Sequence, residues 1–372
     1  MTINNEHKKL NVPNLRFPEF QGEWEKKRLE ECVEFLDGLR KPIKSEDRKS
    51  EQGLYPYYGA SGIIDYIDGY IFDGEYILLS EDGANIIDRN YRVAFIAKGK
   101  IWVNNHAHVL QPYDGFDINF LSETLERLNY AVYNTGTTMP KLNQEVCRNI
   151  NLKIPTTKEQ NKIGNLLSLL NKRIATQNKI IEDLKKLKSA ISKKLLCNDK
   201  WTTYKIQDIA EIGRGRVISS VEIDRQKHPL YPVYSSQTSN NGIMGYLDNY
   251  MFDGEYITWT TDGANAGTVF YRKGKFNCTN VCGTLKILPK FDCYFVSLVL
   301  QQATQKYVSS NLANPKLMNN TMASIKIRMP NIETQKQLSK VFQTLDSCLL
   351  VHQRTCKMYL SEKQYLLRQM FI

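Results

Sequence analysis

Apolar side chains recur with a seven-residue period along two long segments of the chain, residues 158–196 and 333–370. In each segment the repeat marks ten positions on one helical face, and only two of the ten are strongly polar. This spacing is typical of helices that pack together as a coiled coil. A helix of about 39 residues spans roughly 58 Å, so the pattern predicts two long, rigid helices. The marked positions are Ile163, Leu167, Leu170, Ile174, Gln177, Ile181, Leu184, Lys188, Ile191 and Leu195, followed by Leu338, Phe342, Leu345, Leu349, His352, Cys356, Tyr359, Lys363, Leu366 and Met370.

The polar exceptions fall at equivalent places, because Gln177 corresponds to His352 and Lys188 to Lys363. Polar residues on such a face lower stability but fix register and the choice of partner. We therefore expect the two helices to pair with each other, with these four as register residues. An antiparallel pairing is favoured, since the chain between the helices has to carry the end of the first back to the start of the second. A pH sensor or a metal ligand at His352 is the less favoured alternative, because its counterpart is a glutamine.

The segments that precede the two helices repeat each other. Phe72–Ile77 returns as Phe252–Ile257, and Asp82–Asn85 returns as Asp262–Asn265, in both cases after 180 residues. A duplication of this size indicates two similar domains, for which 372 residues leave enough room. The predicted boundaries are 1–20 for an N-terminal extension, 21–157 for the first globular domain, 158–199 for the first long helix, 200–332 for the second globular domain and 333–372 for the second long helix.

Within each globular segment, short runs rich in β-branched and aromatic residues are bounded by Gly and Asp. They predict strands at residues 63–67, 76–79, 101–103 and 109–110 of the first copy. A helix is expected over Phe120–Tyr133. The predicted fold class is α+β, with two tandem globular domains separated by two long antiparallel coiled-coil helices and an internal, pseudo-two-fold duplication.

A short amphipathic helix is expected after each of two tryptophans, Trp24 and Trp201. The apolar residues that follow have the spacing of one helical face, and both runs end at a glycine, Gly38 and Gly215. The face residues are Leu29, Cys32, Val33 and Phe35 in the first copy and Ile206, Ile209, Ala210 and Ile212 in the second.

The composition suits a folded protein with a polyanionic partner. Hydrophobic residues make up 42% of the chain, and the net charge is +11. The charge is uneven, since residues 1–157 carry 19 basic and 23 acidic side chains, whereas residues 158–200 carry 11 and four. If the first domain binds DNA, it has to do so through a few focused loops. The alternative, that basic residues only solvate a helix, stays open on charge alone.

No run of about 18 apolar residues predicts a transmembrane helix, and the first nine residues are polar rather than an apolar signal segment. We therefore expect a cytoplasmic protein without a membrane partner. Its eight cysteines are then expected to be thiols in mostly apolar surroundings.

No catalytic constellation repeats in the two copies. Phosphate-binding and dinucleotide-binding glycine motifs, the adenine-methyltransferase motif and nuclease clusters are absent from the sequence. His106 and His108 form a weak metal motif that the second copy lacks. Cys278, Cys282 and Cys293 have poor spacing for zinc and no fourth ligand. The sequence therefore predicts neither a catalytic nor a metal site in this chain.

The loops between the repeated strings differ in the two copies. The Asp-Gly steps at Asp82 and Asp262 predict turns rather than catalytic acids. Between Tyr58 and Gly62 the first copy has three residues, whereas the second has seven in the same place, residues 235–241. A shared scaffold with two sets of polar loops indicates two recognition modules for different targets. Drift of surface loops after duplication stays the alternative for any single residue.

Several of these strings together resemble the DNA-specificity subunits of type I restriction-modification enzymes. They are Leu15–Phe20 before Trp24, the turn after Tyr55 and Pro56, the Asp-Gly-Ala-Asn loop, Asn104–Leu110, the Pro-Lys-Leu segments and the proline-led start of each long helix. The resemblance covers nearly the whole chain and is more specific in architecture than in any one motif.

The resemblance implies that each globular segment is a target-recognition domain that reads one half of a bipartite, asymmetric DNA site. The helices would set the gap between half-sites and dock two methyltransferase subunits, and two restriction subunits would complete the complex. It also implies that the chain is not catalytic and binds no cofactor or metal. S-adenosylmethionine, ATP and Mg²⁺ would belong to the partner subunits. Because residues 1–157 are acidic overall, we expect the partners to supply much of the phosphate contact.

Two kinds of residue are expected to contact DNA: basic residues after the glycine stops, which would hold phosphates, and polar loop residues, which would read bases. They are Arg40, Lys41, Ser61, Asn85, Arg89 and Lys141 in the first copy and Arg214, Arg216, Gln237, Asn240, Asn265 and Lys316 in the second. Lys172, Arg173, Lys185 and Lys186 on the helices are expected to face partner subunits or the DNA between half-sites. A coiled-coil adaptor without a DNA role and an unrecognised stand-alone enzyme remain the alternatives.

Overall fold

The computed structural model describes residues 11–48, 53–196, 198–309 and 314–372. It divides into two compact units, the first within residues 1–179 and 354–372 and the second within residues 180–353. The polar N-terminus, where we expect no signal segment, lies outside the described residues. Among the described helices, none combines the length and the apolar character that crossing a membrane requires.

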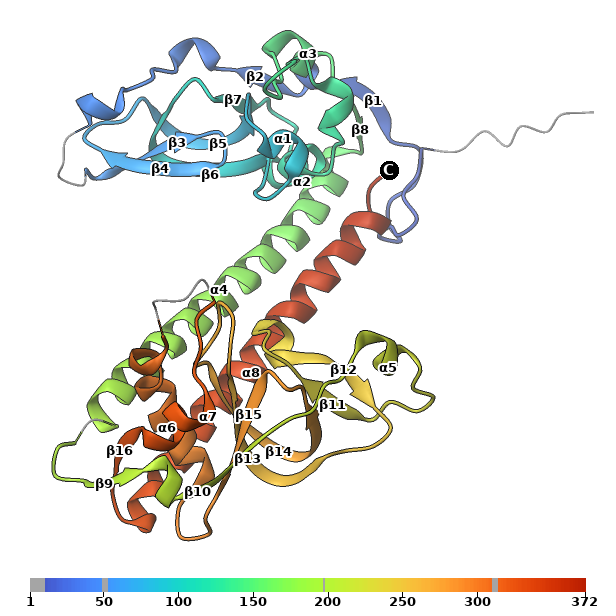
Figure 1. The fold of residues 1–372 in the computed structure, drawn as a ribbon. Helices are drawn as coiled ribbons and strands as arrows, with labels where there is room; N and C mark the ends of the chain where they lie inside the picture. The colour runs from blue at the N-terminus through green and yellow to red at the C-terminus, as the bar shows by residue number, and fades with distance from the viewer. Residues whose placement is uncertain (1–10, 49–52, 197, 310–313) are drawn as a thin grey trace, which may run out of the picture. The chain divides into compact units, whose positions relative to one another are not determined.

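Each unit contains a six-stranded mixed sheet, and the strand order is the same in both (Figure 1). All neighbouring strands are antiparallel except β3 with β6 and β11 with β14, which are parallel. The identical order confirms the predicted duplication. The first sheet runs β2 (Val33–Phe35), β7 (Ala107–Pro112), β5 (Phe72–Ser80), β6 (Ala94–Val103), β3 (Tyr55–Gly59) and β4 (Gly62–Ile67), and the second runs β10 (Ala210–Arg214), β15 (Cys282–Ile287), β13 (Phe252–Thr260), β14 (Val269–Cys278), β11 (Tyr231–Tyr234) and β12 (Ile243–Leu247).

A separate two-stranded ribbon joins the beginning and end of each globular domain. In the first unit β1 (Glu25–Arg28) pairs with β8 (Asn151–Ile154), and in the second β9 (Thr202–Lys205) pairs with β16 (Lys326–Met329). In the second unit the chain therefore arrives from α4 and leaves to α8 through the same ribbon, since β9 follows α4 and β16 precedes α8.

The repeated string at the start of β5 and β13 contains a glycine with a left-handed backbone. Gly74 pairs with Gly99 across the first hairpin, and Gly254 pairs with Gly274 across the second. All four glycines have positive φ, between 80° and 153°. Residues with a side chain strongly disfavour this region, so the duplicated glycines are needed for this backbone conformation. The most evident sequence repeat is thus a scaffold feature.

The predicted helix over residues 120–133 is shorter in the structure. Helix α2 covers Ile118–Glu126, a 3₁₀ turn follows at Tyr130–Tyr133, and the equivalent helix α6 covers Cys293–Ala303. Asp117 and Asp292 cap the two helices by accepting hydrogen bonds from backbone amides. The remaining short helices are α1 (Asn85–Asp88), α3 (Gln144–Arg148), α5 (Ser220–Asp224) and α7 (Asn319–Ser324).

The short amphipathic helix predicted after Trp24 and Trp201 is wrong. In the first unit β1 leads into a 3₁₀ turn at Leu29–Glu31 and then into β2, and the second unit has the same arrangement. The turn places Leu29 and Cys32 on one side because a 3₁₀ helix has three residues per turn. Alternation along the strand then buries Val33 but exposes the next residue. Together the turn and the strand give the apolar residues the same spacing as one face of an α-helix.

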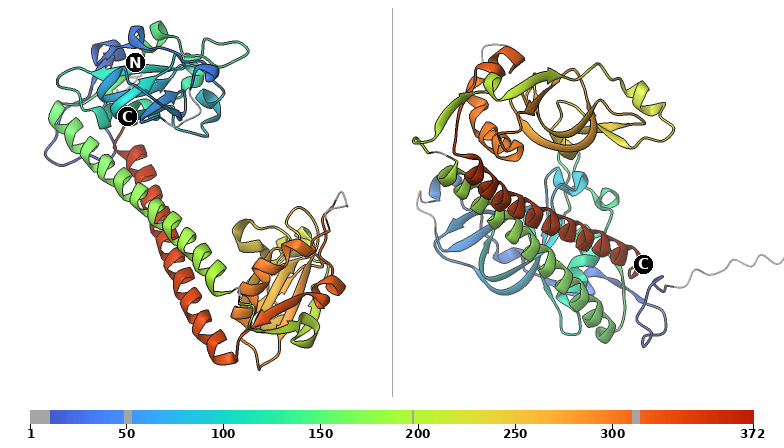
Figure 2. Two further views of the ribbon diagram at one scale, coloured as in Figure 1. Left: turned by 90° about the vertical axis from the view of Figure 1, so that its left-hand side faces the viewer. Right: turned by 90° about the horizontal axis from the view of Figure 1, so that it is seen from below.

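The two long helices are confirmed as α4 (Thr157–Leu195) and α8 (Ile332–Gln369). The first unit contains the start of α4 with the end of α8, and the second contains the end of α4 with the start of α8, so the helices run antiparallel (Figure 2). The predicted heptad positions are the buried or half-buried ones along nearly all of both helices.

Each unit has its own main hydrophobic core. The first core contains Trp24 and Phe120 together with Leu167 of α4 and Phe371 near the chain end. The second contains Trp259 and Phe295 with Phe342 of α8 among others. Of the cysteines in the described part of the chain, all but Cys348 are buried, and all are free thiols, as predicted.

Candidate nucleic-acid interface

In each unit the Asp-Gly-Ala-Asn loop is joined to the Pro-Lys-Leu segment by backbone hydrogen bonds. The amide of Gly83 donates to the carbonyl of Pro140 over 3.0 Å, and the amide of Gly263 donates to that of Pro315 over 3.0 Å. An isolated β-bridge links Asp82 with Lys141 beside the first of these bonds. Two repeated strings that lie far apart in the sequence therefore form one structural element, which we call the loop junction.

A ring nitrogen supports the loop junction in both units, but from a different residue. In the first unit Nε2 of His108 lies 2.8 Å from the carbonyl oxygen of Leu142. In the second unit Nε1 of Trp259 donates to the carbonyl of Leu317 over 2.9 Å. Trp259 comes from the neighbouring strand, and its ring occupies the space that Gly283 leaves at the place of His108. The junction is thus preserved by a paired exchange of residues.

The loop junction of the first unit rests on a buried ion-pair network. Nδ1 of His108 lies 2.7 Å from Oδ2 of Asp37. The guanidinium of Arg40 donates to Glu81 over 2.7 Å and to the carbonyl of Ala107 over 2.8 Å. Because both ring nitrogens of His108 face oxygen acceptors, the imidazole is protonated and donates from both.

Replacing His108 by leucine should lower the free energy of unfolding by about 3 kcal/mol, because the Asp37 carboxylate would lose a buried partner. Burial alone lowers the pKa of His108, but side-chain hydrogen bonds with Asp37 and Cys147 outweigh it and raise the pKa to about 10. The ion pair therefore contributes fully below about pH 6.5, where the unfolded histidine titrates, and is lost as the pH rises towards 10. Urea unfolding at pH 6 and pH 9 measures both effects. Equal stability of the variant and the wild type at pH 6 would contradict this assignment.

The weak metal motif of the first copy has a different explanation. Nδ1 of His106 lies 2.9 Å from the carboxylate of Asp82, whereas His108 turns to Asp37. In the second unit burial raises the pKa of the Cys282 thiol to about 11, which disfavours the thiolate that zinc requires. Within the described residues no group of three or more metal-ligating side chains converges.

The basic residues predicted to hold phosphates in the first unit fall into two groups. Lys41 and Lys141 are exposed. Arg40 is only 13% exposed and engaged in the network above. Arg89 turns to the end of α2, where it donates to Glu126 and lies 5.8 Å from the ring centroid of Tyr130. Nζ of Lys141 lies 3.4 Å from the Glu81 carboxylate, so Lys41 is the freest phosphate-binding candidate of the four.

The polar candidates of the first unit also differ in availability. Ser61 is exposed in the turn between β3 and β4. The Ser80 hydroxyl donates to the carbonyl of Ala60 over 2.5 Å and so holds this turn near the end of β5. Asn85 exchanges two hydrogen bonds with the backbone of Tyr91, 2.7 and 3.1 Å long. The side-chain amide of Asn85 therefore closes the loop in which it lies.

In the second unit the basic candidates lie at the end of β10 and at the loop junction. Arg214 is exposed and lies 3.3 Å from Oδ1 of Asn319. Arg216 forms a two-pronged ion pair with Glu222, with one contact of 2.9 Å. Lys316 is exposed at the junction.

The polar candidates of the second unit lie in its variable loops. Nε2 of Gln237 donates to the carbonyl of Ile243, which closes the long loop from inside. Asn240 is exposed and has a left-handed backbone with φ of 48°. Asn265 is exposed in the Asp-Gly-Ala-Asn loop. For all twelve residues, contact with DNA stays a prediction.

Sequence reasoning missed one residue beside these loops, Arg272 of β14. The strand registers place it opposite Tyr256, whereas Ala97 stands opposite Tyr76 in the first unit. The difference between Arg272 and Ala97 could have been found in the sequence, because the two copies align there without a gap. A cation in place of a buried alanine is not visible as a motif, since the neighbouring residues are ordinary strand residues.

The seam lysines reach carboxylates rather than each other. Lys363 of α8 lies 2.9 Å from Glu123 of α2 in the first unit. Lys188 of α4 pairs with Asp346 of α8 in the second, and the Tyr294 hydroxyl donates to the same carboxylate over 2.5 Å. Both lysines thus lie where a globular domain meets a long helix. Gln177 and His352 are half-buried, and their part in setting the register stays a prediction.

A basic hollow lies on the second unit beside α4. It has a volume of about 660 Å³ and is lined by Lys185, Lys188 and Lys193 of α4 and by Gln301 and Gln302 of α6. Ser189, Ser192, Leu298 and Leu349 also line it, and Lys188 is paired with Asp346, so Lys185 and Lys193 supply its positive charge. The helix residues predicted to face partners or DNA are all exposed, namely Lys172, Arg173, Lys185 and Lys186.

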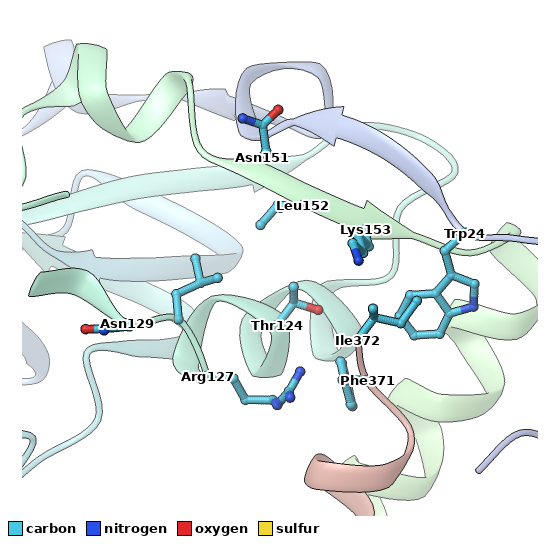
Figure 3. A pocket seen from close by; sticks show the side chains of 10 residues that line it. Trp24, Thr124, Arg127, Asn129, Asn151, Leu152, Lys153, Phe371 and Ile372 are labelled. Atoms are coloured by element: carbon cyan, nitrogen blue, oxygen red, sulfur yellow. The ribbon is translucent and has the colours of Figure 1, made fainter. Parts of the chain in front are cut away.

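A smaller hollow of about 250 Å³ lies in the first unit, where the last residues of the chain meet α2 and β8 (Figure 3). The ring of Phe371 stacks on Phe120 with centroids 5.3 Å apart. The Arg127 guanidinium lies 4.8 Å from the centroid of Phe371. These contacts hold the end of α8 against the first domain, so the hollow serves docking within the unit.

The sequence profile of the type I restriction modification DNA specificity domain matches the chain twice, over residues 21–186 and 198–357. A type I specificity subunit of Mycoplasma pneumoniae is 36% identical over 215 residues, which cover 56% of this chain and 80% of that protein. The specificity subunit of the type I restriction enzyme MpnII from the same organism is 42% identical over 145 residues, 39% of this chain and 43% of that protein. The crystal structure of a type I restriction-modification S subunit from M. genitalium matches with a TM-score of 0.80 at 17% identity and covers 97% of this chain and 99% of that chain. At that identity the likeness shows a shared fold.

Proposed function

The chain belongs to the family defined by the type I restriction modification DNA specificity domain, and from this premise we propose that it selects the DNA sequence on which a type I restriction-modification complex acts. One observation carries the proposal. The two units share their strand order and their loop junction but differ in the loops beside it. A common frame with different polar loops suits the reading of two different half-sites, one by each unit.

The chain would supply recognition and leave catalysis to its partners. Two methyltransferase subunits and two motor-nuclease subunits would complete the complex, with S-adenosylmethionine, ATP and Mg²⁺ bound in those partners. The exposed lysines and arginine of α4 and the basic hollow beside α6 offer a surface of matching charge for an acidic partner or for the DNA between half-sites.

The two long helices would act as the ruler between half-sites. Inserting one heptad into both helices, after residue 179 in α4 and after residue 353 in α8, should widen the gap by up to about three base pairs. Seven residues add about 10.5 Å of helix, and duplex DNA rises about 3.4 Å per base pair. Matched insertions keep the seam in register, whereas an insertion in α4 alone is the mismatched control. Sequencing of methylated sites measures the gap, and altered bases within either half would contradict the ruler role.

Phosphate contacts would come largely from the partners on the side of the first domain. Residues 1–157 carry a net charge of −4, and three of the four basic candidates there are engaged internally. The isolated chain should therefore bind duplex DNA weakly and with a shallow dependence on salt. A steep salt dependence of the chain alone would overturn this division of labour.

The decisive test is single-molecule methylation sequencing of a host that carries the chain with its methyltransferase, compared with the same host lacking the chain. A split, adenine-methylated motif that disappears with the chain would establish the specificity role and reveal the target. No change, with the methyltransferase expressed and bound to the chain, would refute it.

A further inference from the structure

A buried arginine of the second unit is enclosed by two aromatic rings. Arg272 of β14 is 3% exposed. Its guanidinium carbon lies 3.5 Å from the ring centroid of Tyr234 and 4.4 Å from that of Phe270. Nε donates to the hydroxyl of Thr258 over 3.2 Å. The cation is thus held by π faces and one hydroxyl in the middle of the sheet.

The guanidinium lies against the long variable loop, residues 235–242. A Cβ built on Gly242 would lie 3.1 Å from Nη2 of Arg272, and φ of Gly242 is +81°. The amide of Ser235 donates to the carbonyl of Gly242 over 2.9 Å, which closes the base of the loop. Asn240 and Asn241, both left-handed, form its tip. Arg272 therefore contacts the point where this loop returns to the sheet.

The fold does not need a cation at this place. In the first unit the equivalent positions hold Ala97 and Leu78, which are 1% and 0% exposed. Burial lowers the pKa of Arg272, and among the described residues no carboxylate forms an ion pair with it. A buried charge without such a partner is costly unless something else compensates. The first unit, without the arginine, also has the shorter loop by four residues.

We propose that Arg272 is a positioning residue that fixes the 235–242 loop for reading the second half of the DNA target. The inference rests on the proposed DNA-reading function. The loop leaves and rejoins the sheet through the bond between Ser235 and Gly242, so its conformation depends on what supports that base. Clamping between Tyr234 and Phe270 sets where Gly242 lies, and Gly242 in turn orients the tip. The cation beneath the loop also raises the local potential that an approaching phosphate meets.

The first test is Arg272→Met in the full complex, which keeps an unbranched, though shorter, side chain and removes the charge and the hydrogen bond to Thr258. Affinity for duplexes should fall at least tenfold through the second half-site alone. Methylation sequencing should show relaxed bases in that half and an unchanged first half. Thermal unfolding should stay close to that of the wild type, because the lost cation–π contacts are offset by removal of a buried charge that has no carboxylate partner. Arg272→Lys should restore part of the affinity through its charge.

The second test protects against a variant that fails to fold. The double variant Thr258→Leu with Arg272→Ala reproduces the Leu78 and Ala97 packing that the first unit already uses. It should fold and lose second-half discrimination in the same way. A wild-type motif in a folded variant, or loss of both half-sites together, would overturn the positioning role. A wild-type complex that methylates no split motif would instead refute the underlying DNA-reading function, so the two failures are distinguishable.

Discussion

Replacing residues 200–330 with the second recognition domain of another family member should change one half of the recognised DNA sequence and leave the other half intact. The two units have separate main cores, and the loop junctions that would carry recognition form within each unit. Interactions that share no residues behave independently to a good approximation. Recognition of the original second half-site should be lost completely, because each mismatched base pair typically costs about 1–3 kcal/mol of binding free energy and a new half-site changes several base pairs.

The structure indicates where the exchange should be made. β9 and β16 pair with each other, with Thr202 opposite Met329. Both ends of the domain therefore leave through one ribbon, and cuts just outside it keep α4 and α8 intact. The matched control exchanges only residues 235–242, which should alter the second half without affecting stability. Methylation sequencing gives the result directly. Loss of both halves, or a hybrid that still reads the original sequence, would contradict independent reading.

The periodic parts of the fold could be predicted from the sequence because each of them repeats a single interaction many times. The seam of α4 and α8 consists of heptads, so local errors in one turn do not change the conclusion. The duplication could also be predicted, since two copies of a domain keep the sequence strings on which their shared scaffold depends. Gly74 and Gly99 illustrate this, because their positive φ leaves little freedom to change.

Elements shorter than one period could not be predicted. The run from Leu29 to Phe35 combines a 3₁₀ turn with a strand, and together they have the spacing of a helical face. Only pairing of β2 with β7, about 75 residues further on, decides for the strand. A pairing partner at that distance is invisible in a local pattern, and tertiary contacts override local preference.

The candidate site could be predicted from the sequence only in part. The Asp-Gly-Ala-Asn and Pro-Lys-Leu strings were recognised as shared, but their hydrogen bonding to each other required coordinates. Residue type alone does not separate the engaged Arg40 from the exposed Lys41, since their surroundings come from distant segments. The sequence did not predict that Trp259 takes over the role of His108, for the same reason. The two rings stand on different strands and support equivalent carbonyls.

Replacing Glu123 by leucine should destabilise the first unit by about 3–5 kcal/mol, because it leaves two cations without their carboxylate. Glu123 is the charged residue at the contact between α2 and both long helices. Its Oε1 accepts from Arg92 over 2.9 Å, from Asn171 of α4 over 3.0 Å and from Lys363 of α8 over 2.9 Å. The side chain of Glu123 is 3% exposed and that of Lys363 is 13% exposed, so solvent screens this pair little.

The equivalent position of α6 provides the matched control. Leu298 stands there, the same distance beyond the capping aspartate, and the second unit places its acid on α8 instead, as Asp346. Adding Lys363→Met to Glu123→Leu should therefore recover much of the lost stability, which a double-mutant cycle in urea would measure. Hydrogen exchange should increase near the end of α8 in the single variant. A double variant destabilised by the sum of the two single variants would show that the two residues do not act as a pair.

The same carboxylate predicts a response to acid. Burial raises the pKa of Glu123, but Arg92 and Lys363 lower it more, so the net shift is downward. A carboxyl group with a lowered pKa stabilises the folded state above its unfolded pKa of about 4.3 and loses that contribution as the pH falls through the folded value. The wild type should therefore lose stability below pH 4.3 more steeply than the double variant, in which neither charge remains. Parallel acid profiles for the two proteins would mean that the junction is held by packing alone, and that the charges at this contact serve another purpose.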